Sequence, residues 1–158
     1  MNTLYWTAGL LEGEGSFAWR NSYSAKISCG MTDMDVIQRL QDHWGGNINK
    51  QTYKAKPHYK DVYVWVLSGD AAISLMLQLL PLMGERRSER IREVLQSHKN
   101  HQAAMLERRG DMVSRATSAA REYLEGGGSL RDMSAKHGVS YVTVKNYADR
   151  LTGEATAG

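Results

Sequence analysis

Hydrophobic and polar positions recur with two different periods along the first half of the chain, and these periods predict its secondary structure. Apolar residues three or four positions apart indicate helices, and strict apolar–polar alternation indicates strands. In chain order, the predicted elements are a helix over 3–13, strands over 16–20 and 24–31, a helix over 33–44, strands near 47–53 and 61–68, a helix over 70–80 and a longer helix from Ser88. This order predicts an α+β protein with its helices on one face of a four-stranded antiparallel sheet.

The second half of the chain is more polar and predicts a separate, all-helical part. Residues 88–109 are rich in charge and lack an apolar stripe after Leu95, which we interpret as a packing helix that grades into a linker near Gly110. Three short helices are predicted after it, over 116–125, 129–137 and 140–151. We therefore expect two domains, over residues 1–109 and 115–151.

Composition excludes several classes of protein. The single cysteine, Cys29, cannot form an internal disulfide or a CxxC zinc site. The most apolar stretch, 75–83, is too short to cross a bilayer, and the first residues lack the pattern of a signal peptide. We expect an intracellular protein, in the cytoplasm or nucleoid, with no membrane partner.

The positive charge of the chain lies in its second half. Residues 1–83 hold seven Lys or Arg and seven Asp or Glu, whereas residues 84–158 hold thirteen and ten. Clustered cations such as those in "GERRSERIR" are typical of proteins that bind nucleic acid, although solvated helix faces of mixed charge give the same pattern.

The segment "TAGLLEGEGSF" combines small residues in a helix with two acids at its end. Glycine inside a helix costs about 1 kcal/mol relative to alanine, so Gly9 indicates close approach of a second helix. Together with the strand that follows and the order of the elements, this segment resembles the motif of the LAGLIDADG homing endonucleases over roughly residues 3–95. The resemblance implies the αββαββα fold of that family. With only one copy of the motif, it also implies a homodimer on a roughly palindromic DNA target. The helix residues implied to contact the second copy are Thr7, Ala8, Gly9 and Leu10.

The resemblance also implies a role for the two acids. It assigns Glu14 to the position at which the family holds a divalent metal, with the backbone carbonyl of Gly13 as a second ligand, and we interpret Glu12 as structural. Oxygen ligands favour Mg²⁺, or Mn²⁺, and no other small-molecule cofactor is expected. The usual family residue at this position is Asp, so Glu14 is a variant with a longer side chain. Arg86 stands where the family often has a catalytic lysine, and because arginine stays protonated it can stabilise phosphate charge but cannot act as a base.

The family's exposed sheet face lies along the DNA major groove, and alternation predicts which side chains share that face here. Ser, Asn, Gln, Arg and Lys are suited to contact base edges and phosphates. The predicted DNA contacts from this part of the chain are Ser16, Arg20, Lys26, Ser28, Asn49, Gln51, Lys54, Lys56 and Arg87, with Ser24 and Asn47 on the same face. In the fourth strand, Val62, Val64 and Val66 alternate with Tyr63, Trp65 and Leu67, so both of its faces are apolar.

The segment "SLRDMSAKHGVSYVTVKNYADRL" resembles a helix-turn-helix, with Gly138 in the turn and Met133, Val139 and Val144 facing inward. Its second helix would place Ser140, Tyr141, Val142, Lys145 and Asn146 in a major groove. A three-helix packing element without DNA contacts is the alternative.

Three functions remain open on the sequence. The first is a site-specific, metal-dependent endonuclease that cuts both strands of a long pseudo-palindromic DNA target. The second is a non-catalytic, DNA-binding transcriptional regulator on the same fold. The third is an RNA-splicing cofactor, which the helix-turn-helix disfavours.

Overall fold

The computed structural model describes residues 2–20, 24–52 and 60–156 and divides the chain into two compact units, residues 1–101 and 102–158. The boundary falls after His101, ahead of the predicted end of the first domain at residue 109. That each unit is a domain with a function of its own stays a prediction.

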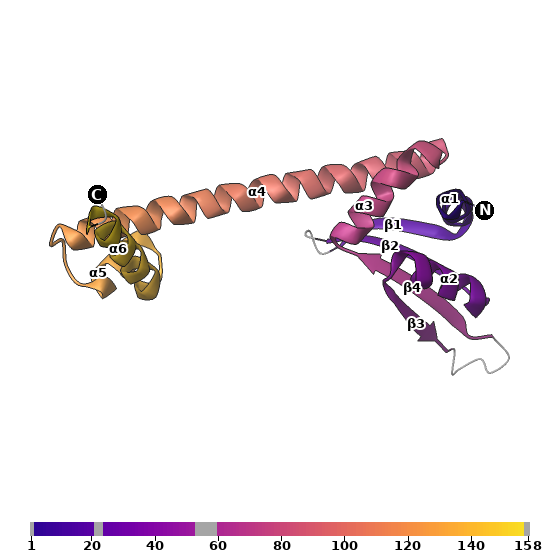
Figure 1. The fold of residues 1–158 in the computed structure, drawn as a ribbon, viewed down its shortest axis with the longest axis horizontal. Helices are drawn as coiled ribbons and strands as arrows, with labels where there is room; N and C mark the ends of the chain where they lie inside the picture. The colour runs from indigo at the N-terminus through magenta and orange to yellow at the C-terminus, as the bar shows by residue number, and fades with distance from the viewer. Residues whose placement is uncertain (1, 21–23, 53–59, 157–158) are drawn as a thin grey trace. The chain divides into compact units, whose positions relative to one another are not determined.

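The first unit has the predicted α+β order. Its elements are α1 (Thr3–Glu14), β1 (Gly15–Arg20), β2 (Ser24–Met31), α2 (Met34–Trp44), β3 (Asn47–Gln51), β4 (Val62–Ser68), α3 (Asp70–Leu79), the short 3-10 helix η1 (Leu80–Leu82) and the first part of α4 (Glu85–Leu124). The four strands form one antiparallel sheet in the order β1-β2-β4-β3 (Figure 1). The predicted sheet is therefore confirmed, and β4 lies inside it with β3 at one edge.

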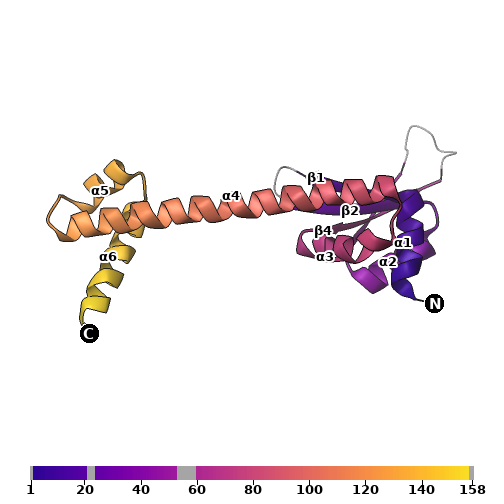
Figure 2. The same ribbon diagram turned by 90° about the horizontal axis from the view of Figure 1, so that it is seen from above.

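Helices α1, α2 and α3 lie on the same side of this sheet (Figure 2). The core between the two layers contains Ile27 and Trp65 from the sheet, Leu11 and Leu40 from α1 and α2, and Leu75 from α3, all fully buried or nearly so. The indole nitrogen of Trp65 donates to the Gly45 carbonyl at 2.8 Å, so its one polar atom is satisfied in this apolar layer.

Helix α1 begins at Thr3, where the predicted helix over 3–13 also begins. The Asn2 side chain accepts a hydrogen bond from the Leu4 amide at 3.0 Å and is the N-cap. The first turns of α4 lie along the free edge of β1 (Figure 1), where Arg90 Nε donates to the Phe17 carbonyl at 3.0 Å. The Trp19 ring also contacts the rings of His98 and His101 on α4.

The expected linker near Gly110 is wrong. Helix α4 is continuous from Glu85 to Leu124 and includes both that glycine and the predicted helix over 116–125. One glycine costs a helix about 1 kcal/mol, which does not end a helix whose other residues favour it.

The second unit packs α5 (Leu130–His137) and α6 (Tyr141–Thr156) against the end of α4. Ala119, Met133, Val139 and Val144 form its core. A capping box between Ser129 and Asp132 begins α5, and Gly138 ends it at a φ of 63°. The Thr143 amide donates to the Ser140 hydroxyl at 3.1 Å at the start of α6.

Candidate metal site and nucleic-acid interface

Glu14 is the last residue of α1, and its carboxylate is exposed at the point where the helix passes directly into β1. Within the described residues it makes no hydrogen bond or ion pair. A carboxylate at the negative end of a helix dipole is disfavoured unless a cation is near. The position therefore suits a residue that binds a cation.

The passage from helix to strand depends on Gly15. Its amide donates to the Leu11 carbonyl, and a Cβ added to it would lie 2.4 Å from the Leu11 oxygen. No side chain fits this backbone approach, so Gly15 fixes where Glu14 lies.

Replacing Gly15 with alanine is expected to lower the free energy of unfolding by about 1–3 kcal/mol, because the backbone of Leu11 must move away. Gly110→Ala is the matched control, since nothing lies within 4 Å of a Cβ at that mid-helix position, which lies outside α1. It is expected to be neutral or slightly stabilising. Urea unfolding of both variants measures this, and equal stability of the two would contradict it.

Arg87 ties the start of α4 to the end of α1. Its Nε donates to the Glu12 carbonyl at 3.1 Å and its Nη2 to the Gly13 carbonyl at 3.3 Å. The Glu12 carboxylate in turn accepts from the Gly84 amide at 2.9 Å, a contact inside the protomer that agrees with a structural role for Glu12. Arg87 was predicted to contact DNA, but its guanidinium caps α1 within the protomer. The Gly13 carbonyl, a predicted metal ligand, already accepts from this cation.

Arg86 is exposed on the first turn of α4, next to Arg87, and makes no hydrogen bond or ion pair among the described residues. Arg86, Arg87 and Arg90 line one shallow hollow together with Glu89 and Glu93. The hollow holds three guanidinium groups and two carboxylates, and Arg90 is paired with Glu93 at 2.6 Å. Arg86 therefore stays available for a ligand, as its predicted role requires.

Cys29 lies opposite Gly15, the residue after Glu14, in the pairing of β2 with β1. Burial, and then the negative charge of Glu14, raise the pKa of the Cys29 thiol to about 11. The second cause means that the negative charge of Glu14 disfavours a thiolate at Cys29, which is buried in the core.

Raising the pH from about 8 to about 11 is expected to destabilise the wild type more than Cys29→Ala. An unfolded thiol titrates near 8.5, so between these two pKa values the unfolded state loses a proton that the folded state keeps, and stability falls. The contribution is fully present below about pH 8.5, is lost as the pH passes 11, and is on the order of 3 kcal/mol. Urea unfolding across this range measures it, and parallel stability curves for the two proteins would show that Cys29 has no such role.

Strand register resolves which side chains share the exposed face of the sheet. Ser16 pairs with Ser28, which pairs with Val66, which pairs with Asn47, and alternation extends this row along each strand. The residues on this face are Ser16, Ala18, Arg20, Ser24, Lys26, Ser28, Gly30, Asn47, Asn49, Gln51, Val62, Val64, Val66 and Ser68. All predicted contacts from the strands therefore lie together, whereas Lys54 and Lys56 lie outside the described residues.

The valines of β4 are the members of this face that the sequence left unassigned. Both faces of β4 are apolar. Only the pairing of β4 with β2 on one side and β3 on the other shows that Trp65 and Leu67 face the helices. Alternation alone could not assign them, because it needs one polar face.

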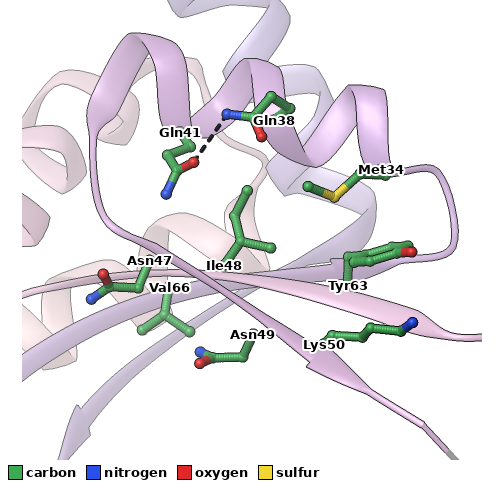
Figure 3. Close-up of a pocket in the computed structure, with 9 residues that line it drawn as sticks. All are labelled: Met34, Gln38, Gln41, Asn47, Ile48, Asn49, Lys50, Tyr63 and Val66. Atoms are coloured by element: carbon green, nitrogen blue, oxygen red, sulfur yellow. Dashed lines mark hydrogen bonds between the residues drawn. The ribbon is translucent and has the colours of Figure 1, made fainter.

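A hollow of about 600 Å³ lies at the β3 edge of the sheet, between that strand and α2 (Figure 3). Gln38, Gln41, Asn47 and Asn49 give it an amide-rich lining, and Gln38 donates to Gln41 at 3.0 Å. Lys50, which also lines it, is paired with Asp61 at 2.7 Å. Asn47 and Asn49 thus border both this hollow and the exposed face.

The predicted contact surface of α1 needs correction. Thr7 and Ala8 are buried within the protomer, and the Thr7 hydroxyl accepts from the Trp44 indole at 2.9 Å, so neither can meet a second copy. Leu10 is half-buried. The exposed stripe contains Tyr5, Gly9 and Gly13, spaced one helical turn apart.

The second unit exposes the side chains predicted to enter a DNA groove. These residues, all exposed at the start of α6, are Ser140, Tyr141, Val142, Lys145 and Asn146. On the inner side, Glu122 of α4 pairs with Lys136 and accepts from His137 at 2.9 Å, which holds α5 against α4. These hydrogen bonds, Lys136 first, lower the pKa of Glu122. The sequence does not predict this cluster, because Lys136 and His137 lie 14 and 15 residues after Glu122 and form no recognisable motif with it.

Two further features bear on function. In residues 2–20, 24–52 and 60–156, no three His, Cys, Asp or Glu side chains gather to hold a metal ion. No helix in this part of the chain is long and apolar enough to cross a membrane.

No protein-family model matches the chain, and no curated protein matches it. Its fold is similar to that of the homing endonuclease I-CvuI in complex with its target in the presence of 2 mM Ca, with a TM-score of 0.50, 14% identity and 94% of each chain covered. A second structure of I-CvuI, with the I-CreI target in the presence of 2 mM Mg and described as revealing DNA not cleaved, gives a TM-score of 0.48 at the same identity and coverage. Element order, sheet and the first of these likenesses agree: the chain has the LAGLIDADG homing endonuclease fold.

Proposed function

We propose that this protein is a divalent-metal-dependent DNA endonuclease that acts as a homodimer on a long, roughly palindromic site. The observation that carries the proposal is the exposed Glu14 carboxylate at the end of α1, beside an exposed helix stripe with two glycines. A pure binding protein has no use for an unpaired acid there, since it would repel the phosphates of DNA.

The exposed stripe supports pairing through α1. Gly9 and Gly13 each have nothing within 4 Å of an added Cβ, so nothing inside the protomer requires glycine at either position. Glycine in a helix is costly, and close approach of a second helix is its common reason. Two α1 helices packed along this stripe bring two Glu14 carboxylates together.

The donor set fits a hard divalent ion. Glu14 offers a carboxylate, and the last carbonyls of α1 lie at the negative end of its dipole. One protomer supplies too few ligands in its described residues, so the second copy is needed to complete the site. Glu14 and the Gly13 carbonyl would hold a Mg²⁺ or Mn²⁺ ion, which would supply activation of water and stabilisation of the leaving oxygen. Arg86 contributes a fixed positive charge for the scissile phosphate and takes no proton.

The exposed sheet face supports DNA as the substrate. The four strands as described contain three cations, Arg20, Lys26 and Lys50, and no carboxylate. Hydroxyl and amide groups surround the first two. Such a surface attracts the phosphate backbone and offers donors and acceptors to base edges.

In the second unit, α5 and α6 form the proposed helix-turn-helix, which adds a DNA contact outside the central site. Support comes from the buried Met133, Val139 and Val144 on one side and from Tyr141 and Val142, which are 56% and 48% exposed, on the other. Large exposed side chains at the start of a second helix suit insertion into a groove.

A non-catalytic regulator is the second candidate, and one observation favours it. Arg87 already donates to the Gly13 carbonyl, and a metal ion at that oxygen would lie next to a guanidinium. Loss of metal binding with retention of the polar sheet face would give a DNA-binding protein on this fold.

Incubation of the protein with the genomic DNA that flanks its gene tests the proposal. With Mg²⁺ we expect double-strand cuts at one site, and footprinting is expected to show protection that extends beyond the centre because the second unit adds contacts. Chelation of the metal should abolish cutting. Specific protection without cutting under any divalent ion would support the regulator.

A further inference from the structure

The valines of β4 form an apolar stripe in the middle of the polar sheet face. Val66 lies between Ser28 and Asn47, and Val64 lies between Gly30 and Asn49. Val62 continues the row opposite Gln51. The stripe is therefore bordered on both sides by the strands whose polar residues the proposed function uses.

These valines are accessible, and Gly30 leaves room beside them. Each is only partly buried, in contrast to Trp65 on the other face of the same strand. A Cβ at Gly30 would lie 3.4 Å from a methyl group of Val64 and 3.8 Å from one of Val62. Methyl groups of Val62 and Val64 thus lie beside Gly30. The middle of the face therefore presents methyl groups rather than hydrogen-bond donors.

The surroundings of the stripe select its partner. Lys26 and Arg20 are the cations on this face, and none of its described members is acidic. A protein partner that covered the valines alone would leave these cations and amides without partners. Duplex DNA matches both features, because its phosphates pair with the cations and its major groove displays one apolar group, the C5-methyl of thymine.

We propose that Val62, Val64 and Val66 read thymine methyl groups in the major groove. This inference rests on the proposed function and adds the class of sequence that the site prefers. The polar residues on either side contact the flanking bases and backbone, and the stripe favours thymine at the base pairs beneath it.

The test begins with the wild-type protein and a library of randomised duplex DNA, without divalent metal so that bound DNA stays intact. In the enriched sequence, each thymine is then replaced singly by deoxyuridine, which removes only the methyl group. Loss of one buried methyl contact is expected to weaken binding about fourfold at the thymines under the stripe.

Val64→Thr connects the effect to the stripe, since threonine keeps the shape of valine and replaces a methyl group with a hydroxyl. In this variant, deoxyuridine is expected to leave the affinity unchanged at the one thymine that Val64 contacts, so that the ratio of the two affinities is about one there. Val36→Thr on α2, away from the sheet face, is the matched control and should keep the full penalty.

The outcomes separate the two proposals. If no sequence is enriched, the proposed function is overturned together with this inference. If a sequence is enriched but deoxyuridine changes nothing in the wild type, or the penalty persists in Val64→Thr, only the inference is overturned. The wild-type measurement stands even if a variant does not fold.

Discussion

Glu14→Gln is expected to reduce DNA cleavage by on the order of a thousandfold while DNA binding stays nearly unchanged. Glutamine keeps the shape of the side chain but removes the charge that would hold a divalent ion, and charge stabilisation by such an ion is worth several kcal/mol in a transition state. Binding depends on the sheet face, which does not include Glu14. Cleavage rate and affinity for the same DNA, measured separately, test the two halves of this expectation.

Glu89→Gln provides the control for this change. Glu89 is an exposed acid near the start of α4 that lines the hollow beside Arg86, so its removal changes the net charge by the same amount. It is expected to leave cleavage within a few-fold of the wild type. Equal loss in both variants would show that general charge, rather than Glu14, determines the rate.

Gly9→Ala and Gly9→Glu are expected to act on the protomer and on the dimer in opposite directions. Nothing lies within 4 Å of a Cβ at Gly9, so alanine should stabilise the isolated helix by about 1 kcal/mol. In the proposed dimer the same position is where two helices approach. Alanine should therefore weaken association, and a charged side chain should abolish it because the charge would be buried without a partner.

Gly110→Ala is the matched control, because Gly110 is also a mid-helix glycine with nothing within 4 Å of an added Cβ. It should bring the same gain in helix stability with no change in assembly. Sedimentation velocity measures the oligomeric state, and thermal unfolding measures stability. A wild type that sediments as a monomer at all concentrations and on DNA would refute pairing through α1.

Much of the first unit could be predicted because hydrophobic and polar residues recur with a clear period in its helices and strands. The two strands over 16–20 and 24–31 alternate strictly, and the observed β1 and β2 differ from them by one residue at most. Helix 33–44 likewise ends at its two glycines, with Trp44 as its last residue. Where one face of an element is buried and the other polar, the sequence specifies both its type and its orientation.

The errors arise where that contrast is lost. Residues after Leu95 are polar on all sides, so the sequence could not distinguish a helix from a linker, and α4 continues through Gly110. In β4 both faces are apolar, and only pairing with β2 and β3 assigns Val64 to the exposed side.

The candidate site was predicted in part. The position of Glu14 followed from the local motif, because a helix end is a local feature. Thr7 and Ala8 were assigned to a second copy, but their burial depends on Trp44 and the core, which are distant in sequence. The contact of Arg87 with the Glu12 carbonyl joins residues 75 apart and has no local signal.

The hydrogen bond from Arg90 to the Phe17 carbonyl has a consequence for how copies of this protein meet. An open sheet edge is a template for strand addition and aggregation, and Arg90 occupies an acceptor on the outer side of β1. The opposite edge, β3, is five residues long and carries Lys50, which discourages a second strand from docking there. Both edges of the sheet, β1 and β3, thus carry features that discourage a strand of another copy from pairing with them.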